Sequence, residues 1–92
     1  MNFEVEFSQE KSFLLLATRG INFDDVLEAI KNNEVLDDLK HHNEKRSNQR
    51  VLVLKIKKYV YAVPYVIDWK RKIIFLKTVY PSKVLTNRYL NK

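Results

Sequence analysis

Basic and aromatic side chains are the residues whose chemistry stands out, and they gather in the second half of the sequence. Lysine and arginine can neutralise phosphates, and aromatic rings can stack on unpaired bases. This combination indicates a polyanionic ligand such as RNA, while the alternative for each single lysine is a solvated surface position. The set consists of Arg46, Arg50, Lys55, Lys57, Lys58, Lys70, Arg71, Lys72, Lys77, Lys83, Arg88, Tyr59, Tyr61, Tyr65, Trp69, Tyr80 and Tyr89.

The same residue types suffice for RNA cleavage without a metal ion. Attack by a ribose 2′-hydroxyl needs a base to take its proton, cations to stabilise the charge on the phosphorane, and an acid for the leaving oxygen. Lysine, arginine, tyrosine and histidine can fill these roles. The composition permits this reaction but does not specify it.

Other chemistries find little support in the sequence. The chain has no cysteine and no Gly-x-Ser-x-Gly motif, and its single glycine, Gly20, excludes P-loop and dinucleotide fingerprints. His41 and His42 are adjacent, and neighbouring side chains on a strand point to opposite faces, so they do not suit one metal ion. We therefore expect no cofactor and no metal site.

Charge is distributed unevenly along the chain. The net charge is +6, but residues 1–39 hold three basic and nine acidic residues, whereas residues 40–92 hold fourteen basic and two acidic ones. An acidic half of −6 therefore precedes a basic half of +12. Such asymmetry favours a polyanionic partner for the basic half.

Length and hydropathy predict one small domain, residues 1–92. No apolar run approaches the roughly 20 residues of a membrane span, so we expect no membrane partner. The first residues lack the basic segment of a signal peptide. A cytoplasmic location is the expectation.

Three apolar runs, residues 51–56, 59–67 and 73–79, predict an antiparallel meander, since they are rich in Val, Ile, Leu, Tyr and Phe. If both turns hold two central residues, Ile56 opposes Tyr59 and Tyr65 opposes Ile74. One face of this sheet is then bulky and uncharged and is expected to meet the helices. The other is apolar with two lysines, Lys55 and Lys77, and is expected to be a binding surface or a partly solvated one.

The remaining elements complete an expected β-α-α-β-β-β-β-α order. Residues 2–7 alternate like an edge strand, and residues 35–41 read as a weaker strand before a polar loop, 42–49. A helix is expected from the cap Ser8 to about Thr18, and another from the cap Asn22 to residue 31 or 32. Ser82 is the expected cap of a short C-terminal helix. The apolar residues expected to be buried on the two N-terminal helices are Phe13, Leu14, Leu16, Ala17, Phe23, Val26, Leu27 and Ile30.

Two segments resemble the signatures of BrnT-type toxins, members of the RelE/ParE-like group. Lys11 followed by residues 19–25 (Arg-Gly-Ile-Asn-Phe-Asp-Asp) is similar to a family pattern of Lys, then His-Gly-[Val/Ile]-[Ser/Thr]-Phe and two acidic residues. Residues 81–89 are similar to the family's final segment. Arg19 stands where the family has His, Leu15 where it has Asn, and Tyr80-Pro81 where the last strand ends in Arg.

The resemblance implies an α+β fold with two N-terminal helices packed on an antiparallel sheet and a short C-terminal helix, as in RelE/BrnT-like toxins. It implies the toxin of a bacterial type II toxin–antitoxin module, a metal-independent endoribonuclease that inhibits translation. The expected partners are RNA and a cognate DNA-binding antitoxin, with a dimer or a heterotetramer with antitoxin as the assembly.

Residue roles follow from the basic half together with the resemblance. The candidate catalytic residues are Arg50, Lys77 and Lys83 for phosphate and transition-state charge, and Tyr80 and His41 for proton transfer. The candidate nucleic-acid-binding residues are Lys55, Lys57, Lys70, Arg71 and Arg88. The alternative is a non-catalytic protein-interaction or RNA-binding module that uses the same sheet face. Direct DNA binding is less favoured, since neither internal helix is basic.

Overall fold

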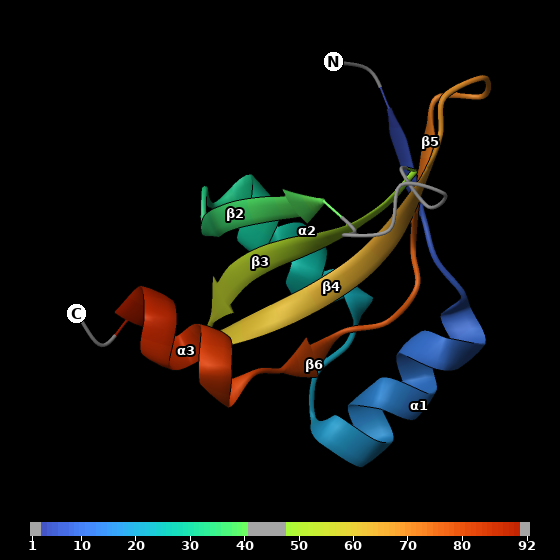
Figure 1. The fold of residues 1–92 in the computed structure, drawn as a ribbon. Helices are drawn as coiled ribbons and strands as arrows, with labels where there is room; N and C mark the ends of the chain where they lie inside the picture. The colour runs from blue at the N-terminus through green and yellow to red at the C-terminus, as the bar shows by residue number, and fades with distance from the viewer. Residues whose placement is uncertain (1–2, 41–47, 91–92) are drawn as a thin grey trace.

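The computed structural model describes residues 3–40 and 48–90, and this part of the chain forms an α+β fold of three helices and one mixed sheet (Figure 1). The predicted element order is confirmed, with one short strand added. The elements are β1 (Glu4–Glu6), α1 (Gln9–Arg19), α2 (Phe23–Lys31), β2 (Val35–Lys40), β3 (Gln49–Ile56), β4 (Tyr59–Asp68), β5 (Ile73–Leu76), β6 (Tyr80–Pro81) and α3 (Lys83–Leu90).

The sheet runs in the order β1-β5-β4-β3-β2, with β6 paired to β4 beyond the end of β5. All pairs are antiparallel except one: β1 lies parallel to β5 at the edge of the sheet. The expectation of a wholly antiparallel sheet is therefore wrong. β1 and β5 are far apart in the chain, so no hairpin fixes their direction. The predicted edge position of β1 is confirmed.

The first predicted register is confirmed, and the second is wrong by two residues. Ile56 opposes Tyr59 across a two-residue turn in which Lys57 and Lys58 have φ of 52° and 69°, the left-handed values that tight hairpins require. Tyr65 opposes Leu76 rather than Ile74, because the second turn spans four residues. The Asp68 carboxylate stabilises this longer turn by accepting a hydrogen bond from the Arg71 N–H at 3.0 Å. A shift of two residues leaves every side chain on its predicted face.

The last predicted strand, residues 73–79, is also divided. β5 ends at Leu76, and the chain pairs again only at β6. Between them, the Val79 carbonyl accepts a hydrogen bond from Nη1 of Arg19 at 2.8 Å instead of joining a strand ladder. Pro81 is the last residue of β6, and Ser82 caps α3, its Oγ accepting from the Leu85 N–H at 3.1 Å, as predicted.

Both N-terminal helices begin and end where their capping residues predict. Ser8 accepts a hydrogen bond from the Lys11 N–H at 3.1 Å, and Gly20 ends α1 in the left-handed conformation, φ 69°. At the start of α2, Asn22 and Asp25 form a reciprocal capping box. The short turn between the helices follows from these caps.

The predicted burial of α1 is wrong. Phe13, Leu14 and Leu16 are 72%, 63% and 48% exposed, and Ala17 is exposed as well. The buried positions are Leu15 and Ser12, whose Oγ accepts a hydrogen bond from the Phe23 N–H at 3.2 Å. This bond turns the Ser12–Leu15 side of the helix toward α2, so the opposite side remains outside the core.

On α2, Phe23 and Val26 are fully buried as predicted and Leu27 is partly buried. Ala29 is buried instead of Ile30, which is 37% exposed. The packing stripe is therefore rotated slightly from the predicted one.

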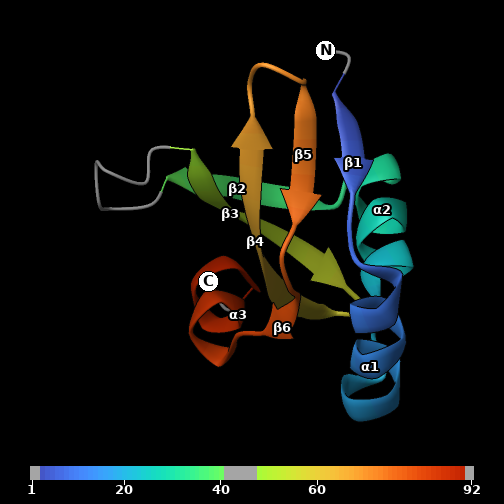
Figure 2. The ribbon, with the colours of Figure 1, turned by 90° about the vertical axis from the view of Figure 1, so that its right-hand side faces the viewer.

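Helices cover both faces of the sheet, α1 and α2 on one side and α3 on the other (Figure 2). We call the first side the α2 face; its central side chains are Leu52, Leu54, Ile56, Tyr61, Val63, Tyr65, Ile67, Ile74 and Leu76. We call the second side the α3 face; it carries Val51, Val53, Lys55, Val60, Ala62, Pro64, Val66, Ile73, Phe75 and Lys77.

The main core lies between the α2 face and the two N-terminal helices, as predicted for the bulky, uncharged face. Val53, Val60 and Ala62 on the α3 face are also buried, but outside that core, and the Val60 N–H donates to Oγ1 of Thr86 in α3 at 3.0 Å. The binding surface predicted for this face is therefore partly occupied by the chain's own C-terminal helix. No helix in the described part of the chain is long and apolar enough to cross a membrane.

Candidate nucleic-acid interface

Three of the predicted catalytic residues lie close together on one edge of the α3 face. Lys77 follows β5, and its N–H donates to the Pro64 carbonyl at 2.9 Å, while Tyr80 in β6 pairs with Ala62. Pro64 and Ala62 are two residues apart on β4, so Lys77 and Tyr80 are spaced by about 7 Å along the strand and share its face. Lys83 is the first residue of α3, three residues after Tyr80. Lys77, Tyr80 and Lys83 are all exposed.

Aromatic and apolar surface adjoins these residues. Phe75, 41% exposed, lies two residues before Lys77 in the chain and therefore on the same face. Pro64 and Val66, opposite Lys77 and Phe75 on β4, are partly exposed. An exposed ring next to a lysine on one face, with a second lysine at the start of α3, combines the stacking surface and positive charge that proteins use to bind single-stranded nucleic acid. We call Phe75, Lys77, Tyr80 and Lys83 the basic edge.

Local charge favours a phosphate at this edge. Residues 59–90 contain six basic residues and one acid, Asp68. The acids on the α3 face are Glu4 and Asp68, which flank Ile73, Glu6, which pairs with Phe75, and Asp37, which accepts a hydrogen bond from the Tyr89 hydroxyl. The segment from Lys77 to Lys83 itself contains two lysines and no acid, so a phosphate is favoured there rather than beside Ile73.

Arg50 lies on the other face of the sheet, separate from these residues. Its Nε contacts Oδ1 of Asp38 at 3.0 Å, and its Nη2 donates to the Asp38 carbonyl at 3.2 Å. The Tyr65 hydroxyl donates to both carboxylate oxygens of Asp38, at 2.7 and 2.8 Å. The structure therefore holds Arg50 in an ion pair on the α2 face, opposite the Lys77 side.

This environment shifts two pKa values. The hydrogen bond to Asp38 raises the pKa of Arg50, so the guanidinium stays charged. Burial, and then the hydrogen bond to Asp38, raise the pKa of Tyr65 to about 12. Its hydroxyl is therefore protonated at neutral pH and acts as a donor, which makes it a poor general base.

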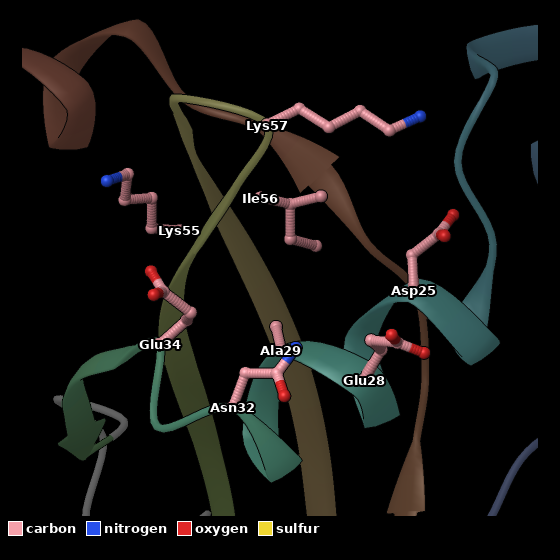
Figure 3. A pocket seen from close by; sticks show the side chains of 8 residues that line it. All are labelled: Asp25, Glu28, Ala29, Asn32, Glu34, Lys55, Ile56 and Lys57. Carbon is pink, nitrogen blue, oxygen red and sulfur yellow. The ribbon is translucent and has the colours of Figure 1, made fainter.

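Lys55 and Lys57 line a cleft of about 560 Å³ between α2 and the β3–β4 turn (Figure 3). Lys55 projects to the opposite side of β3 from Ile56, and three carboxylates share the cleft with the two lysines. Repulsion from three carboxylates makes this cleft unfavourable for a phosphate. The acidic residues are Asp25, Glu28 and Glu34.

The other predicted nucleic-acid-binding residues are spread along the molecule. Lys70 and Arg71 lie in the β4–β5 turn, and Lys57 lies in the β3–β4 turn. The ten residues of β4 separate these turns by about 33 Å. Arg88 lies in the last turn of α3, next to Tyr89. His41 lies outside the described residues. Among the described residues of the second half, the cations therefore do not form one continuous surface.

Sequence reasoning did not anticipate two carboxylate–tyrosine pairs. Asp37 accepts a hydrogen bond from the Tyr89 hydroxyl on the α3 side, while Asp38 accepts from Tyr65 on the α2 side. The hydrogen bond between Tyr89 and Asp37 lowers the pKa of Asp37 and raises the pKa of Tyr89. Because side chains alternate along a strand, the sequence could have indicated that Asp37 and Asp38 point to opposite faces. Their tyrosine partners could not be predicted in this way, because these contacts depend on tertiary packing.

Comparison with protein-family models and with curated proteins finds no match to this chain. The described residues also contain no group of three or more His, Asp or Glu side chains placed to hold a metal ion.

Proposed function

We propose that this protein binds single-stranded RNA at the basic edge and cleaves it as the metal-independent endoribonuclease toxin of a type II toxin–antitoxin module. The observation that carries the proposal is the adjacency of Lys77, Tyr80 and Lys83 beside the exposed ring of Phe75. Two helices at the N-terminus, followed by four antiparallel strands and a C-terminal helix, also agree with the RelE/BrnT-like arrangement that the sequence resembles.

The residues of the basic edge take distinct roles in this proposal. Lys77 and Lys83 bind phosphates and stabilise the charge that develops on the phosphorane, and Phe75 stacks on a base. Tyr80 lies between the lysines in the chain and moves a proton to or from the reacting oxygens. Arg50, paired with Asp38 on the opposite face, has a structural role.

Binding is tested by fluorescence anisotropy with a labelled single-stranded RNA at several salt concentrations. The variant Lys77→Gln/Lys83→Gln is expected to bind more weakly and to lower the magnitude of the log K–log[salt] slope by about 1.4, since each phosphate contact to a single strand contributes about 0.7. The matched control, Lys11→Gln/Lys31→Gln, removes the same charge from α1 and α2 and should change the slope far less. Equal slopes in the two variants would contradict the proposal.

Cleavage is tested by incubating the protein and RNA in EDTA. We expect products that end in a 2′,3′-cyclic phosphate, and we expect Tyr80→Phe to slow their appearance by about 10²–10⁴-fold while RNA affinity is retained. If the RNA binds but remains intact at high protein concentration, the proposed nuclease activity is contradicted and only RNA binding is supported.

A second candidate, a protein-interaction module, is favoured by the exposed apolar side of α1. Phe13 and Leu14 are 72% and 63% exposed and adjoin each other on the helix surface. An antitoxin or a second copy of the chain are the proposed occupants of such a surface. Light scattering distinguishes the candidates, because a monomer that binds RNA supports the first, and a tight oligomer that ignores RNA supports the second.

A further inference from the structure

A hollow of about 230 Å³ lies on the α2 face, beside the β4–β5 turn. Strands β2, β3, β4 and β5 contribute to it, together with Phe3, which precedes β1. Trp69, from the β4–β5 turn, closes one side. The lining residues are Phe3 beside β1, Ile74 on β5, Tyr65 and Ile67 on β4, Arg50 on β3, Asp38 on β2, and Trp69.

One wall of the hollow is aromatic. The rings of Phe3 and Trp69 meet edge to face, with centroids 5.7 Å apart and planes at 84°. Trp69 nevertheless remains 63% exposed. Indole is the largest side-chain surface for stacking, so an exposed indole beside a cavity offers a platform for a planar ligand. The volume is below the roughly 300–1,000 Å³ of pockets for drug-sized ligands, which limits the occupant to about one ring system.

The opposite wall is polar and bears both a donor and an acceptor. A carboxylate can accept about four hydrogen bonds and a guanidinium can donate five. In the described contacts, Oδ1 of Asp38 accepts from Arg50 Nε, the single proton of the Tyr65 hydroxyl is shared between Oδ1 and Oδ2, and Arg50 uses Nε and Nη2. Both groups therefore have capacity for a ligand edge that presents donors beside an acceptor.

The turn that carries Trp69 is basic. Lys70, Arg71 and Lys72 follow it directly, and all three are exposed. An anionic group attached to a ring in the hollow would meet these cations on leaving it. The aromatic wall, the donor–acceptor wall and the adjacent cationic turn are complementary to the planar base, the hydrogen-bonding edge and the phosphate of a nucleotide.

We propose that this hollow binds the base of a guanine nucleotide, with the ring against Trp69 and Phe3, its N1–H and amino group on Asp38, its O6 on Arg50, and its phosphate toward Lys70–Lys72. Guanine is the base that presents two adjacent donors next to an acceptor, whereas the corresponding edge of adenine lacks the N1–H donor. The site is on the opposite face from the basic edge and does not depend on RNA binding there.

Trp69 is the sole tryptophan, so intrinsic fluorescence reports directly on this site. We expect GMP to change Trp69 emission saturably, AMP to bind about tenfold or more weakly, and ribose 5-phosphate to have no effect at concentrations up to about 10 mM. The absence of a saturable change with GMP, or equal affinities for GMP and AMP, would overturn the assignment.

Two variants make the test independent of fluorescence artefacts, with binding measured by calorimetry. Asp38→Asn is expected to weaken GMP binding at least tenfold, and Asp24→Asn, an exposed carboxylate on α2, serves as its control. Ile74→Phe fills the hollow with an apolar side chain, keeps the Asp38–Arg50–Tyr65 contacts, and is expected to abolish GMP binding. Retained GMP binding in a folded Ile74→Phe protein would overturn the proposal. RNA anisotropy of this variant should be unchanged, so failure here is distinguishable from failure of the basic edge.

Discussion

The hydroxyl of Tyr65 on β4 donates to both carboxylate oxygens of Asp38 on β2, at 2.7 and 2.8 Å. Because β3 lies between these strands, the bond crosses one strand on the α2 face and secures the edge of the sheet. Arg50 on β3 binds the same carboxylate from between them. The network therefore occupies the one arginine that was predicted for catalysis and frames one wall of the hollow.

This network predicts a specific loss of stability at high pH. The pKa of Tyr65 is raised to about 12 in the folded protein from an ordinary value of about 10. The contribution of the protonated hydroxyl to the free energy of unfolding is therefore complete below about pH 10 and is lost as pH rises toward 12. We expect the stability difference between wild type and Tyr65→Phe to shrink over this interval by roughly 1–2 kcal/mol, after discounting for partial solvation. Urea unfolding of both proteins at pH 9, 10, 11 and 12 measures it, with Tyr59→Phe as control. A constant difference across the interval would contradict this account.

Arg50 provides a second test, because the structure separates it from the basic edge. We expect Arg50→Gln to change RNA affinity less than about threefold and to cost roughly 0.2–1 kcal/mol of stability, the range of partly exposed ion pairs. Anisotropy with the same labelled RNA and urea unfolding give the two numbers. A loss of RNA affinity as large as that of Lys77→Gln/Lys83→Gln would show that Arg50 belongs to the RNA-binding surface and would contradict this separation.

The unexpected orientation of α1 leads to a third prediction. Leu15 is 5% exposed, so Leu15→Ala should lower the free energy of unfolding by about 2–5 kcal/mol. Phe13→Ser and Leu14→Ser, on the exposed side, should each change it by only about 0.5 kcal/mol. Chemical denaturation of the three variants checks the order. A Phe13→Ser variant as unstable as Leu15→Ala would mean that the exposed side is covered.

Local patterns predicted the elements because capping residues and turns act over a few residues. Ser8, Gly20, Asn22 and Ser82 all lie at helix ends, and Lys57-Lys58 fixed the first hairpin register. The second register was missed because the Asp68 side chain stabilises a four-residue turn. The orientation of α1 was missed because four consecutive apolar residues surround the helix and do not indicate which side packs.

The basic edge was predictable for a similar reason. Lys77, Tyr80 and Lys83 are near in the chain, so local geometry keeps them near in space. Alternation along β3 also carried a signal that was not used: Arg50, like Leu52 and Leu54, points to the α2 face, away from Lys55 and Lys77. The hollow could not be predicted, since it brings together residues from four strands, from the segment before β1 and from the β4–β5 turn.

RNA binding at the basic edge of the α3 face can be located residue by residue with amide chemical-shift mapping, using a short single-stranded RNA. We expect the largest shifts at the amides of Phe75, Lys77, Tyr80 and Lys83, while the amides of α1 stay unchanged. Shifts centred on α1 or on the cleft beside Lys57, at RNA concentrations that saturate the anisotropy change, would contradict it.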